Sequence, residues 1–420
     1  MQRIGRLLDE LDHPERLLRG ALVGGTNGKG SVVAMTQSVL TGAGLRVGTM
    51  PKPHLVSYRE RIAVGGGALS PERFAAAISR VLPAVDRVAA SLGPPTEFEV
   101  LTAAALLELS LARVDLAIVE VGLGGRLDAT NAIDLGVAAI TNVQHDHEAH
   151  LGPTLARIGG EKAPIIKRGN LAVTGASGRG LRPIIDRCAA LGVPLRRAGP
   201  RQPYRVTLRH VGWDGTLVDA STPSAELRDL ALGLLGAHQA ANAAVALALL
   251  DALVEDAERR DEALSLDEET LRSGLAAARW PGRMELLSDP RFGRVLLDGA
   301  HNPAGAAALA STLEALGVHG MPLVVGAMRG KKVGAVLRAL APLEPRPVFT
   351  AVADPGAHSP AELLRAWRRV APGGEAIADP MAALTRAAEL RRGDEPLVVA
   401  GSLYLVGALR GALTGETEEA

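Results

Sequence analysis

The sequence predicts an α/β fold with two domains and mainly parallel β-sheets. Short apolar runs alternate with helical patterns over most of the 420 residues, and this alternation is typical of parallel sheets covered by helices. A chain of this length is expected to form two or three domains. Pro281 and Gly282 break a helical pattern, after which the alternation starts again. We therefore expect a larger domain over residues 1–282 and a smaller, Rossmann-like domain over residues 283–420.

The individual elements follow from the same pattern. The first strand candidate is the run Ala21–Val23, and a helical pattern follows it over residues 32–40. Further strand candidates lie near residues 114–121, 135–143, 294–298, 322–327, 347–352 and 396–401. Helical patterns begin at Pro71 and at His238. Prolines, glycines and short alternating runs over residues 170–235 predict a βα turn followed by small antiparallel strands. We expect the tail, residues 415–420, to be frayed.

Composition and charge exclude several classes of protein. Trp, Tyr and Phe together make up 2% of the chain, so Leu, Val, Ile and Ala must build the core. The formal net charge is zero, which argues against an extended nucleic-acid footprint and against a polybasic membrane patch. The single cysteine, Cys188, excludes an intrachain disulfide and fits a reducing compartment.

The N-terminus and the apolar runs indicate where the protein works. Residues 1–10 are charged and lack the continuous apolar core of a signal peptide. The longest apolar runs are shorter than a membrane span. We expect a cytoplasmic protein that interacts neither with membranes nor with nucleic acid.

A glycine-rich segment directly after the first strand candidate is the most informative motif. Residues 24–31 read G-G-T-N-G-K-G-S. Glycines let backbone N–H groups approach an anion, and the N-terminus of the following helix adds partial positive charge. Lys29 can reach the outer phosphates of a nucleotide, and Ser31 can reach a phosphate-bound Mg²⁺. The usual P-loop has Ser or Thr directly after Gly-Lys, whereas here Gly30 intervenes. A plain glycine-rich turn is the alternative interpretation.

A second motif, E-V-G-L-G-G-R-L-D-A-T-N, begins at Glu120 near the end of a strand candidate. Ligands bind at the carboxyl edge of an open α/β sheet. A buried carboxylate there needs a cation, so Glu120 is a candidate metal ligand. The alternative is a structural turn in which Glu120 pairs with Arg126.

Three histidines follow the next strand candidate, in T-N-V-Q-H-D-H-E-A-H-L-G. His145, His147 and His150 resemble a zinc-hydrolase pattern, but Ala149 stands where that pattern needs Asp. A single metal-binding His147, oriented by Asp146 or another partner, is the milder interpretation. His145 and His150 are more simply explained as loop residues facing solvent.

Two further groups are suggestive only in combination. Glu161 and Lys162 alone indicate a solvated pair on a helix. Arg283, at the expected hinge, can clamp a phosphate when two domains close. Asp298 and His301, in L-L-D-G-A-H-N-P after a strand candidate, suit contact with ribose hydroxyls or phosphate.

Together these clusters resemble the bifunctional dihydrofolate synthase/folylpolyglutamate synthase family, the folate branch of the Mur ligase superfamily. The resemblance runs in order from about residue 3 to residue 410. It is carried by the strings G-T-N-G-K-G-S, P-H-L-V-S-Y-R-E-R-I, T-E-F-E, E-V-G-L-G-G-R-L-D-A-T-N, D-H-E-A-H-L-G, E-K-A, G-A-H-Q-A-A-N-A-A, P-G-R-M-E, D-G-A-H-N-P and G-S-L-Y-L-V-G.

The resemblance implies an ATP-dependent ligase with a P-loop central domain of the Mur type. ATP would phosphorylate a carboxylate of dihydropteroate, or of the terminal glutamate of a reduced folate. The amine of L-glutamate would then attack the acyl phosphate, forming an amide and releasing phosphate. The family is commonly monomeric, so we expect a monomer.

The resemblance also assigns roles by position in the motifs. It implies ATP contacts from Thr26, Asn27, Gly28, Lys29, Gly30, Ser31, Asn242, Arg283, Asp298 and His301. It implies two Mg²⁺ ions with the ligands Ser31, Glu120, His147 and Lys162, the lysine being carbamylated. It implies pterin contacts from Thr96, Phe98, Glu99 and Asp128. Lys29, His147 and Lys162 are the implied catalytic residues.

Four features depart from the family pattern. Lys52 stands where the family has a Mg²⁺-binding serine, and an ammonium cannot ligate a cation. Pro164 replaces a glycine beside Lys162. The string R-G-K-K at residues 329–332 replaces an acidic string near the expected glutamate side. The chain also begins near the end of the N-terminal helix and loop with which the family contacts pterin.

These departures leave alternatives open. One is a paralogous Mur-type ligase that joins another amino acid to another carboxylate, as Lys52 and Lys331-Lys332 suggest. Another is a nucleotide-binding regulatory protein that has lost catalysis. A zinc hydrolase built on the three histidines is a further alternative.

Overall fold

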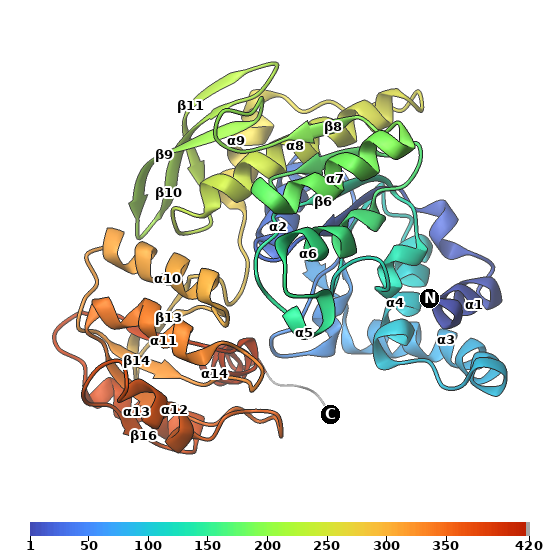
Figure 1. The fold of residues 1–420 in the computed structure, drawn as a ribbon. Helices are drawn as coiled ribbons and strands as arrows, with labels where there is room; N and C mark the ends of the chain where they lie inside the picture. The colour runs from blue at the N-terminus through green and yellow to red at the C-terminus, as the bar shows by residue number, and fades with distance from the viewer. Residues whose placement is uncertain (417–420) are drawn as a thin grey trace.

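The computed structural model of the chain describes residues 1–416 and has the expected α/β architecture with mainly parallel sheets. Residues coloured blue to yellow-green in Figure 1 carry an eight-stranded and a three-stranded sheet, and the orange and red residues carry a six-stranded sheet. The position predicted for the domain boundary, residue 282, falls between the last helix before the six-stranded sheet and its first strand. The division at that residue stays a prediction. The tail residues 417–420 lie outside the described part of the chain.

The eight-stranded sheet has the order β4-β3-β2-β5-β1-β6-β7-β8. Strands β2, β5, β1, β6, β7 and β8 pair in parallel, and β3 and β4 add an antiparallel edge. The bounds are β1 (Gly20–Gly24), β2 (Val47–Met50), β3 (Ala63–Val64), β4 (Gly67–Ala68), β5 (Leu116–Glu120), β6 (Gly136–Ile140), β7 (Leu171–Thr174) and β8 (Leu195–Arg197).

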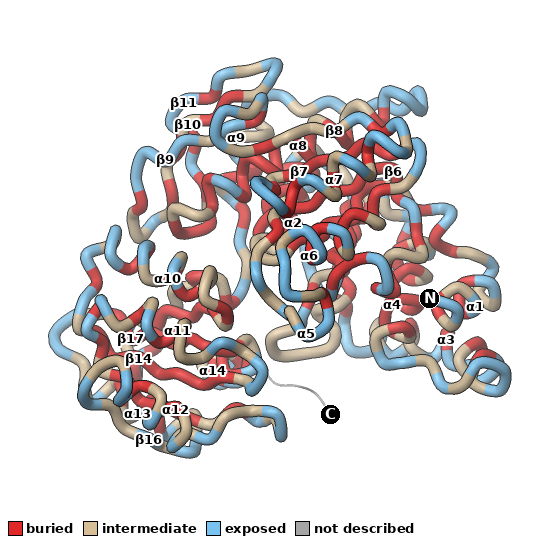
Figure 2. The backbone as a smooth tube through the Cα atoms, in the orientation of Figure 1, coloured by how far each residue is buried: buried red, intermediate tan, exposed pale blue. Residues whose placement is uncertain are grey.

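Helices cover both faces of this sheet. Leu22 of β1 packs into one core, while its neighbours Ala21 and Val23 pack into the other, as the alternation of side chains along a strand requires. The buried positions therefore run through the strands and the facing helices (Figure 2). The helices of the first core are α1 (Gln2–Glu10), α3 (Pro71–Leu92), α4 (Glu97–Leu111), α6 (Leu155–Lys162) and α7 (Gly178–Leu191). Those of the second are α2 (Lys29–Gly42), α8 (Gln239–Glu258) and α9 (Glu268–Ala277).

The three-stranded sheet confirms the antiparallel strands expected within residues 170–235. It consists of β9 (Arg205–Gly212), β10 (Gly215–Ser221) and β11 (Glu226–Leu232), in the order β11-β10-β9. The βα unit before it, β7 and α7, returns to the large sheet through β8. Short helical turns complete this part of the chain: α5 (Glu148–Leu151), η1 (Pro14–Leu17), η2 (Tyr58–Arg61), η3 (Ala129–Ala132) and η4 (Ala163–Ile165).

The six-stranded sheet has the order β12-β13-β17-β14-β15-β16, with only β12 antiparallel to its neighbour. Its strands are β12 (Glu285–Asp289), β13 (Gly293–Leu297), β14 (Pro322–Val325), β15 (Arg346–Phe349), β16 (Glu375–Ala376) and β17 (Leu397–Ala400). Two cores again lie on its two faces. They include helices α10 (Pro303–Ala315), α11 (Val333–Leu340), α12 (Pro360–Trp367), α13 (Pro380–Glu389) and α14 (Leu403–Thr414), with the turn η5 (Ala341–Leu343) beside them.

The topology of the large sheet places the loops that carry the sequence motifs at one edge. Val23 of β1 lies beside Glu120 of β5, and Gly24 lies beside Ile140 of β6. Met50 of β2 lies beside the residue before Glu120. Because these strands are parallel, their carboxyl ends and the loops that follow them meet at the same edge. None of the helices described over residues 1–416 is long and apolar enough to cross a membrane.

We predict that the contact of α14 with the loop after β2 tolerates no added side chain. A Cβ atom at Gly407 would overlap the carbonyl oxygen of Leu55. Gly407→Ala should therefore lower the free energy of unfolding by about 1–3 kcal/mol, because the helix must move away from the loop. Gly5→Ala is the control, since a Cβ at that helical position meets no other described atom within 4 Å. It should raise stability by about 0.5–1 kcal/mol. Equal effects in denaturant titrations would contradict the prediction.

Candidate active site

A cavity of about 650 Å³ opens at the carboxyl edge of the large sheet and is closed on its other side by loops of the six-stranded sheet. Most of the residues singled out from the sequence line it: Thr26, Asn27, Gly28, Lys29, Gly30, Ser31, Phe98, Glu120, Asp128, His147, Lys162, Asn242, Arg283, Asp298 and His301. Segments as far apart in the sequence as those of Gly25 and Tyr404 thus form one site.

Thr96 and Glu99 are the predicted residues that do not line this cavity. They cap α4 in a reciprocal pair, in which the Thr96 hydroxyl accepts from the Glu99 N–H and the Glu99 carboxylate accepts from the Thr96 N–H. Arg3 also donates to the Glu99 carboxylate, at 2.9 Å. Only Phe98 from this segment faces the cavity, so a pterin contact of the other two stays a prediction.

The glycine-rich segment forms the turn between β1 and α2. Gly28 has φ +79° and caps α2, where a Cβ atom would collide with the Asn242 side chain. Gly30, which departs from the usual P-loop spacing, lies against the ring of Trp280, and a Cβ atom would overlap it. Close packing of Gly28 against α8 and of Gly30 against Trp280, which stands directly before Pro281 and Gly282, therefore explains why both positions are glycine. The N–H groups of the first turn of α2 face the cavity, which suits an anionic ligand.

Lys29 bends back over the loop from which it projects. Its Nζ donates to the carbonyl oxygens of Gly25 and Thr26, both at 3.3 Å, and lies 3.9 Å from Glu120 Oε1. Ser31, one turn further along α2, is buried. Lys29 is thus positioned between the phosphate loop and the carboxylate at the end of β5.

Glu120 is a buried carboxylate whose charge is only partly compensated. It is 3% exposed, and its Oε2 accepts from the backbone N–H of Lys52 at 3.2 Å. Burial raises the pKa of Glu120 above its ordinary value, against the attraction of Lys29. A carboxylate in this position is suited to hold a cation beside the phosphates.

Lys162, at the end of α6, is a buried residue that lines the same cavity. It is 3% exposed, and its Nζ donates to the carbonyl oxygen of Gly25 at 2.9 Å. Burial, together with repulsion by Lys29, lowers the pKa of Lys162 to about 7. A substantial fraction of the amine is therefore uncharged and nucleophilic near neutral pH, in contrast to the solvated pair that Glu161 and Lys162 alone would indicate.

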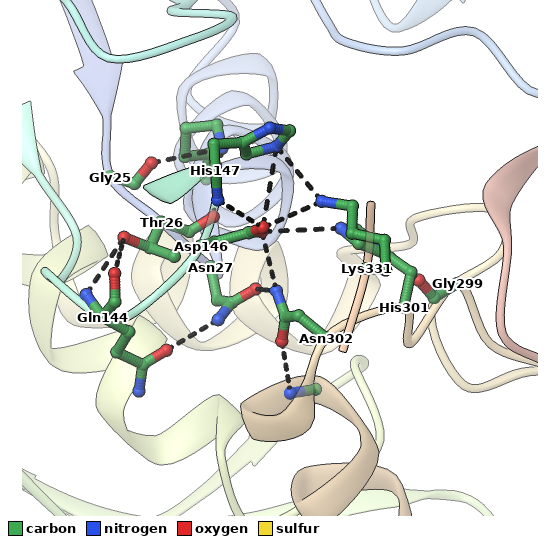
Figure 3. A network of polar contacts seen from close by, with 12 residues as sticks. Gly25, Thr26, Asn27, Gln144, Asp146, His147, Gly299, His301, Asn302 and Lys331 are labelled. Carbon is green, nitrogen blue, oxygen red and sulfur yellow. Dashed lines mark hydrogen bonds and ion pairs between the residues drawn. The ribbon is translucent and has the colours of Figure 1, made fainter. Parts of the chain in front are cut away.

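Asp146 joins the two walls of the cavity (Figure 3). It follows β6 and accepts hydrogen bonds from Asn302 Nδ2 at 3.0 Å and from Lys331 Nζ at 2.8 Å. His301 Nε2 lies 3.8 Å from the same carboxylate. Burial opposes the charged form, but the contacts with His301 and Lys331 hold the pKa of Asp146 well below its usual range. We call Asp146, Asn302 and Lys331 the interdomain clasp.

The clasp also contacts the phosphate loop and His147. Asn302 Nδ2 donates to Asn27 Oδ1 at 3.1 Å, and Lys331 Nζ lies 3.3 Å from His147 Nε2. Sequence reasoning identified Asp146 only as an orienting partner of His147. It noted Lys331 only as a departure from the family pattern near the expected glutamate side, and it did not single out Asn302. The signal in the sequence was that these residues stand in motifs that follow strands. A single sequence does not show which strand ends of two different sheets face each other.

The three histidines do not form a common site. His145 pairs with Glu148 at 2.9 Å, with its side chain 51% exposed, and neither it nor His150 lines the cavity. Over residues 1–416 no group of three or more His, Cys, Asp and Glu side chains is positioned to hold a metal ion. This geometry does not support the zinc-hydrolase alternative. It is compatible with Mg²⁺, which takes most of its ligands from phosphate and water.

Asn242 and Asp298 shape the nucleotide side of the cavity. Asn242 Nδ2 donates to Gln239 Oε1 at 2.8 Å at the start of α8. The Asp298 carboxylate accepts from the N–H groups of Met284 and Ala300, both at 2.9 Å. Arg283 lines the cavity next to Asp298 in the hinge segment. Their contacts with ATP stay predictions.

Comparisons with known proteins assign the chain to a family. Residues 72–250 match the Mur ligase middle domain, and residues 282–403 match the Mur ligase glutamate ligase domain. The chain is 37% identical over 318 residues to the dihydrofolate synthase/folylpolyglutamate synthase of Bacillus subtilis. The aligned region covers 74% of this chain and 71% of that protein. The chain belongs to the dihydrofolate synthase/folylpolyglutamate synthase family. The resemblance inferred from the motifs is thus confirmed.

Solved structures of this family share the whole fold. A Mycobacterium tuberculosis folylpolyglutamate synthase complexed with ADP has a TM-score of 0.89 at 33% identity and covers 98% of this chain and 94% of that one. Escherichia coli FolC in complex with DHPP and ADP has a TM-score of 0.83 at 29% identity, with 99% and 93% of the two chains covered. The similarity in fold to these structures therefore extends over nearly the whole chain, including the residues that line the cavity.

We predict that Asp146→Asn loosens the interdomain clasp. The amide leaves Lys331, whose side chain is only 19% exposed, without its anionic partner. The radius of gyration in small-angle X-ray scattering should increase. Since the pKa of Asp146 is depressed, the carboxylate should keep the domains closed above the ordinary Asp pKa of about 4 and release them only as pH falls through its lower folded value.

Glu148→Gln is the matched control for this prediction. It removes the ion pair with Lys332, whose side chain is 61% exposed, between the same two segments. An exposed pair contributes at most about 1 kcal/mol, so the scattering curve should not change. If both variants open the molecule equally, Asp146 has no special role.

Proposed function

We propose that this protein is an ATP-dependent ligase that joins L-glutamate to dihydropteroate, to the terminal glutamate of a reduced folate, or to both, through an acyl phosphate. The observation that carries the proposal is the cavity itself. On one side the cavity is lined by the phosphate loop at the start of α2 together with Glu120, Lys162 and Phe98. Arg283 and Asp298, from the part of the chain that carries the six-stranded sheet, close the other side. Family membership supports the same reaction class.

The first step needs charge neutralisation and positioning more than covalent catalysis. A carboxylate oxygen of the acceptor attacks the γ-phosphorus of ATP, and the bond to ADP breaks. The N–H groups at the start of α2 and the Lys29 ammonium stabilise the charge on the phosphates. Arg283, in the hinge segment, contacts the phosphates from the opposite wall when the domains are closed.

The residues on the acceptor side fit a cation. Buried Glu120, with the hydroxyl of Ser31 and the ring of His147 in the same cavity, offers the donors that Mg²⁺ would use beside phosphate oxygens. Bound Mg²⁺ would neutralise the phosphates and the acyl phosphate. Lys162, if carbamylated, would present a further carboxylate-like ligand from α6, which is the basis for a second ion.

In the second step the neutral amine of L-glutamate attacks the acyl carbon, the amide bond forms, and phosphate leaves. The clasp keeps the two walls together, so that water is excluded from the acyl phosphate while the amine approaches. Without that exclusion the intermediate would hydrolyse. We also propose that the protein acts as a monomer on small anionic substrates rather than on nucleic acid, and its formal net charge of zero supports the second part of this proposal.

The proposal is tested by turnover of the purified protein. ADP release should require ATP, L-glutamate and either dihydropteroate or tetrahydrofolate, and hydroxylamine should trap the acyl phosphate when glutamate is omitted. Lys29→Met should reduce turnover by about 100-fold or more, because the charge beside the phosphates is lost. ATP binding without ADP release in the presence of any pterin would instead support the regulatory alternative.

A second prediction concerns carbamylation of Lys162. A carbamate forms when the neutral amine attacks CO2, and the pKa of Lys162 is lowered to about 7. The modifiable fraction therefore increases as pH rises through that value and is small about one unit below it. Protein kept free of CO2 below pH 7 should lose activity and regain it with bicarbonate above pH 7.

Labelled bicarbonate gives a readout that does not depend on turnover. Its carbamate signal in NMR should appear in the wild type and vanish in Lys162→Ala. Lys167→Ala is the matched control, since Lys167 is a second lysine with a pKa lowered by burial, to about 8, but lies outside the cavity. A signal that survives in Lys162→Ala would place the carbamate elsewhere.

A further inference from the structure

Lys52 is a buried lysine whose amine has no hydrogen-bond acceptor. Its side chain is 6% exposed and lines the cavity beside Phe98 and Asp128. In the described part of the chain, its Nζ has no hydrogen-bond partner. Leaving a buried ammonium without acceptors is costly. The roles proposed above for the site leave this group without a function.

The nearest carboxylate cannot take up the Lys52 ammonium. Asp128 Oδ1 lies 3.8 Å from Nζ, beyond hydrogen-bonding distance. The four acceptor positions of the Asp128 carboxylate are already used. Oδ2 accepts from the N–H groups of Gly122 and Leu123, and Oδ1 accepts from the N–H and the hydroxyl of Thr130. The charge of Asp128 therefore keeps the Lys52 ammonium in place, but the three N–H donors of that ammonium remain available.

The position of Lys52 is defined by two rigid contacts. Its backbone N–H donates to Glu120 Oε2 at 3.2 Å, and its Nζ lies 3.6 Å from the centroid of the Phe98 ring. The ring supports the cation from one side. The N–H donors of the Lys52 ammonium are therefore available to a group that enters the cavity.

The anion that would use these donors lies between the nucleotide and the acceptor. Lys29 Nζ approaches Glu120 from the phosphate loop, and the backbone N–H of Lys52 donates to the same carboxylate, while the Lys52 ammonium lies beside Phe98 and Asp128. Lys29 and the N–H groups at the start of α2 already supply the donors that phosphates would need. The carboxylate to be phosphorylated must lie next to the γ-phosphate. Lys52 is anchored by its backbone to the same Glu120 carboxylate that Lys29 approaches, and its ammonium lines the cavity beside Phe98 and Asp128.

We propose that Lys52 binds the acceptor carboxylate, so that its ammonium holds the attacking oxygen in line with the γ-phosphate and stabilises the acyl phosphate that forms. This inference rests on the proposed ligase function and adds a specificity-determining residue to it. It explains why an ammonium is kept where it has no hydrogen-bond acceptor: the substrate carboxylate supplies one.

Equilibrium binding tests the inference, with the nucleotide site occupied by AMPPCP. The probes are dihydropteroate and its primary carboxamide, which has the same shape without the negative charge. Lys52→Met should weaken binding of the carboxylate about tenfold or more, the loss expected for a charged hydrogen bond. Binding of the carboxamide and of AMPPCP should stay unchanged, and Lys52→Arg should retain most of the affinity for the carboxylate.

Two further measurements separate binding from structure. Lys52→Met removes a buried ammonium that has no hydrogen-bond acceptor, while Asp128 keeps the four donors that satisfy its carboxylate. The midpoint of thermal unfolding should therefore stay the same or rise, whereas loss of a structural lysine would lower it. Lys167→Met is the control, because Lys167 is also largely buried but is hydrogen-bonded to Asn131 and lies outside the cavity. It should not change the affinity for either probe.

The possible outcomes are distinct. Equal losses for carboxylate and carboxamide would make Lys52 a packing residue, and a loss confined to AMPPCP would make it a phosphate ligand; either overturns the inference. Unchanged binding of dihydropteroate to Lys52→Met overturns it while leaving the ligase function intact. A wild type that binds neither dihydropteroate nor tetrahydrofolate overturns the proposed function and the inference together.

Discussion

Parallel pairing of β1 with β5 and β6 is the constraint on which the site depends. It brings the carboxyl ends of three strands to one edge, and the loops there hold each other in place. Thr26 N–H donates to the carbonyl oxygen of Asn142, and the Thr141 hydroxyl and Asn142 side chain both donate to the carbonyl oxygen of Asn27. The backbone N–H groups at the start of α2 are thereby oriented before any ligand binds, and preorganisation of this kind favours charge stabilisation in the transition state.

The cavity gathers charges that the protein alone does not balance. Lys29, Lys52 and Lys162 line it together, and repulsion from Lys29 acts on the other two. Burial lowers the pKa of Lys52 to about 7, with Asp128 and Glu120 acting against the change. Such an arrangement costs stability, as functional sites often do. The phosphates and carboxylates of the substrates have the charge that would restore the balance.

The fold was largely accessible from the sequence because its signals are local. The apolar runs at 114–121 and 135–143 correspond to β5 and β6, and the pattern from Pro71 corresponds to α3. The phosphate loop could be recognised because glycine, lysine and serine must stand in a fixed order for one backbone turn. Thr96 and Glu99 were harder, since the same T-x-x-E spacing serves a helix cap, and only the structure shows both side chains satisfied at the start of α4.

The sequence by itself determined the order of strands and helices and the phosphate loop, because each depends on residues close together along the chain. It also determined the family, because the order of the motifs along the chain can be compared without a structure. Only the tertiary structure decided which charges meet. The contact of Asp146 with Lys331 spans 185 positions, and the isolation of the Lys52 ammonium depends on Asp128 being saturated by other donors. The energy of a contact between charges depends on their separation and burial, which the residue types alone do not give. In the sequence, Lys52 is therefore only a departure from the family motif, whereas its surroundings in the fold are the basis for the binding role that we propose.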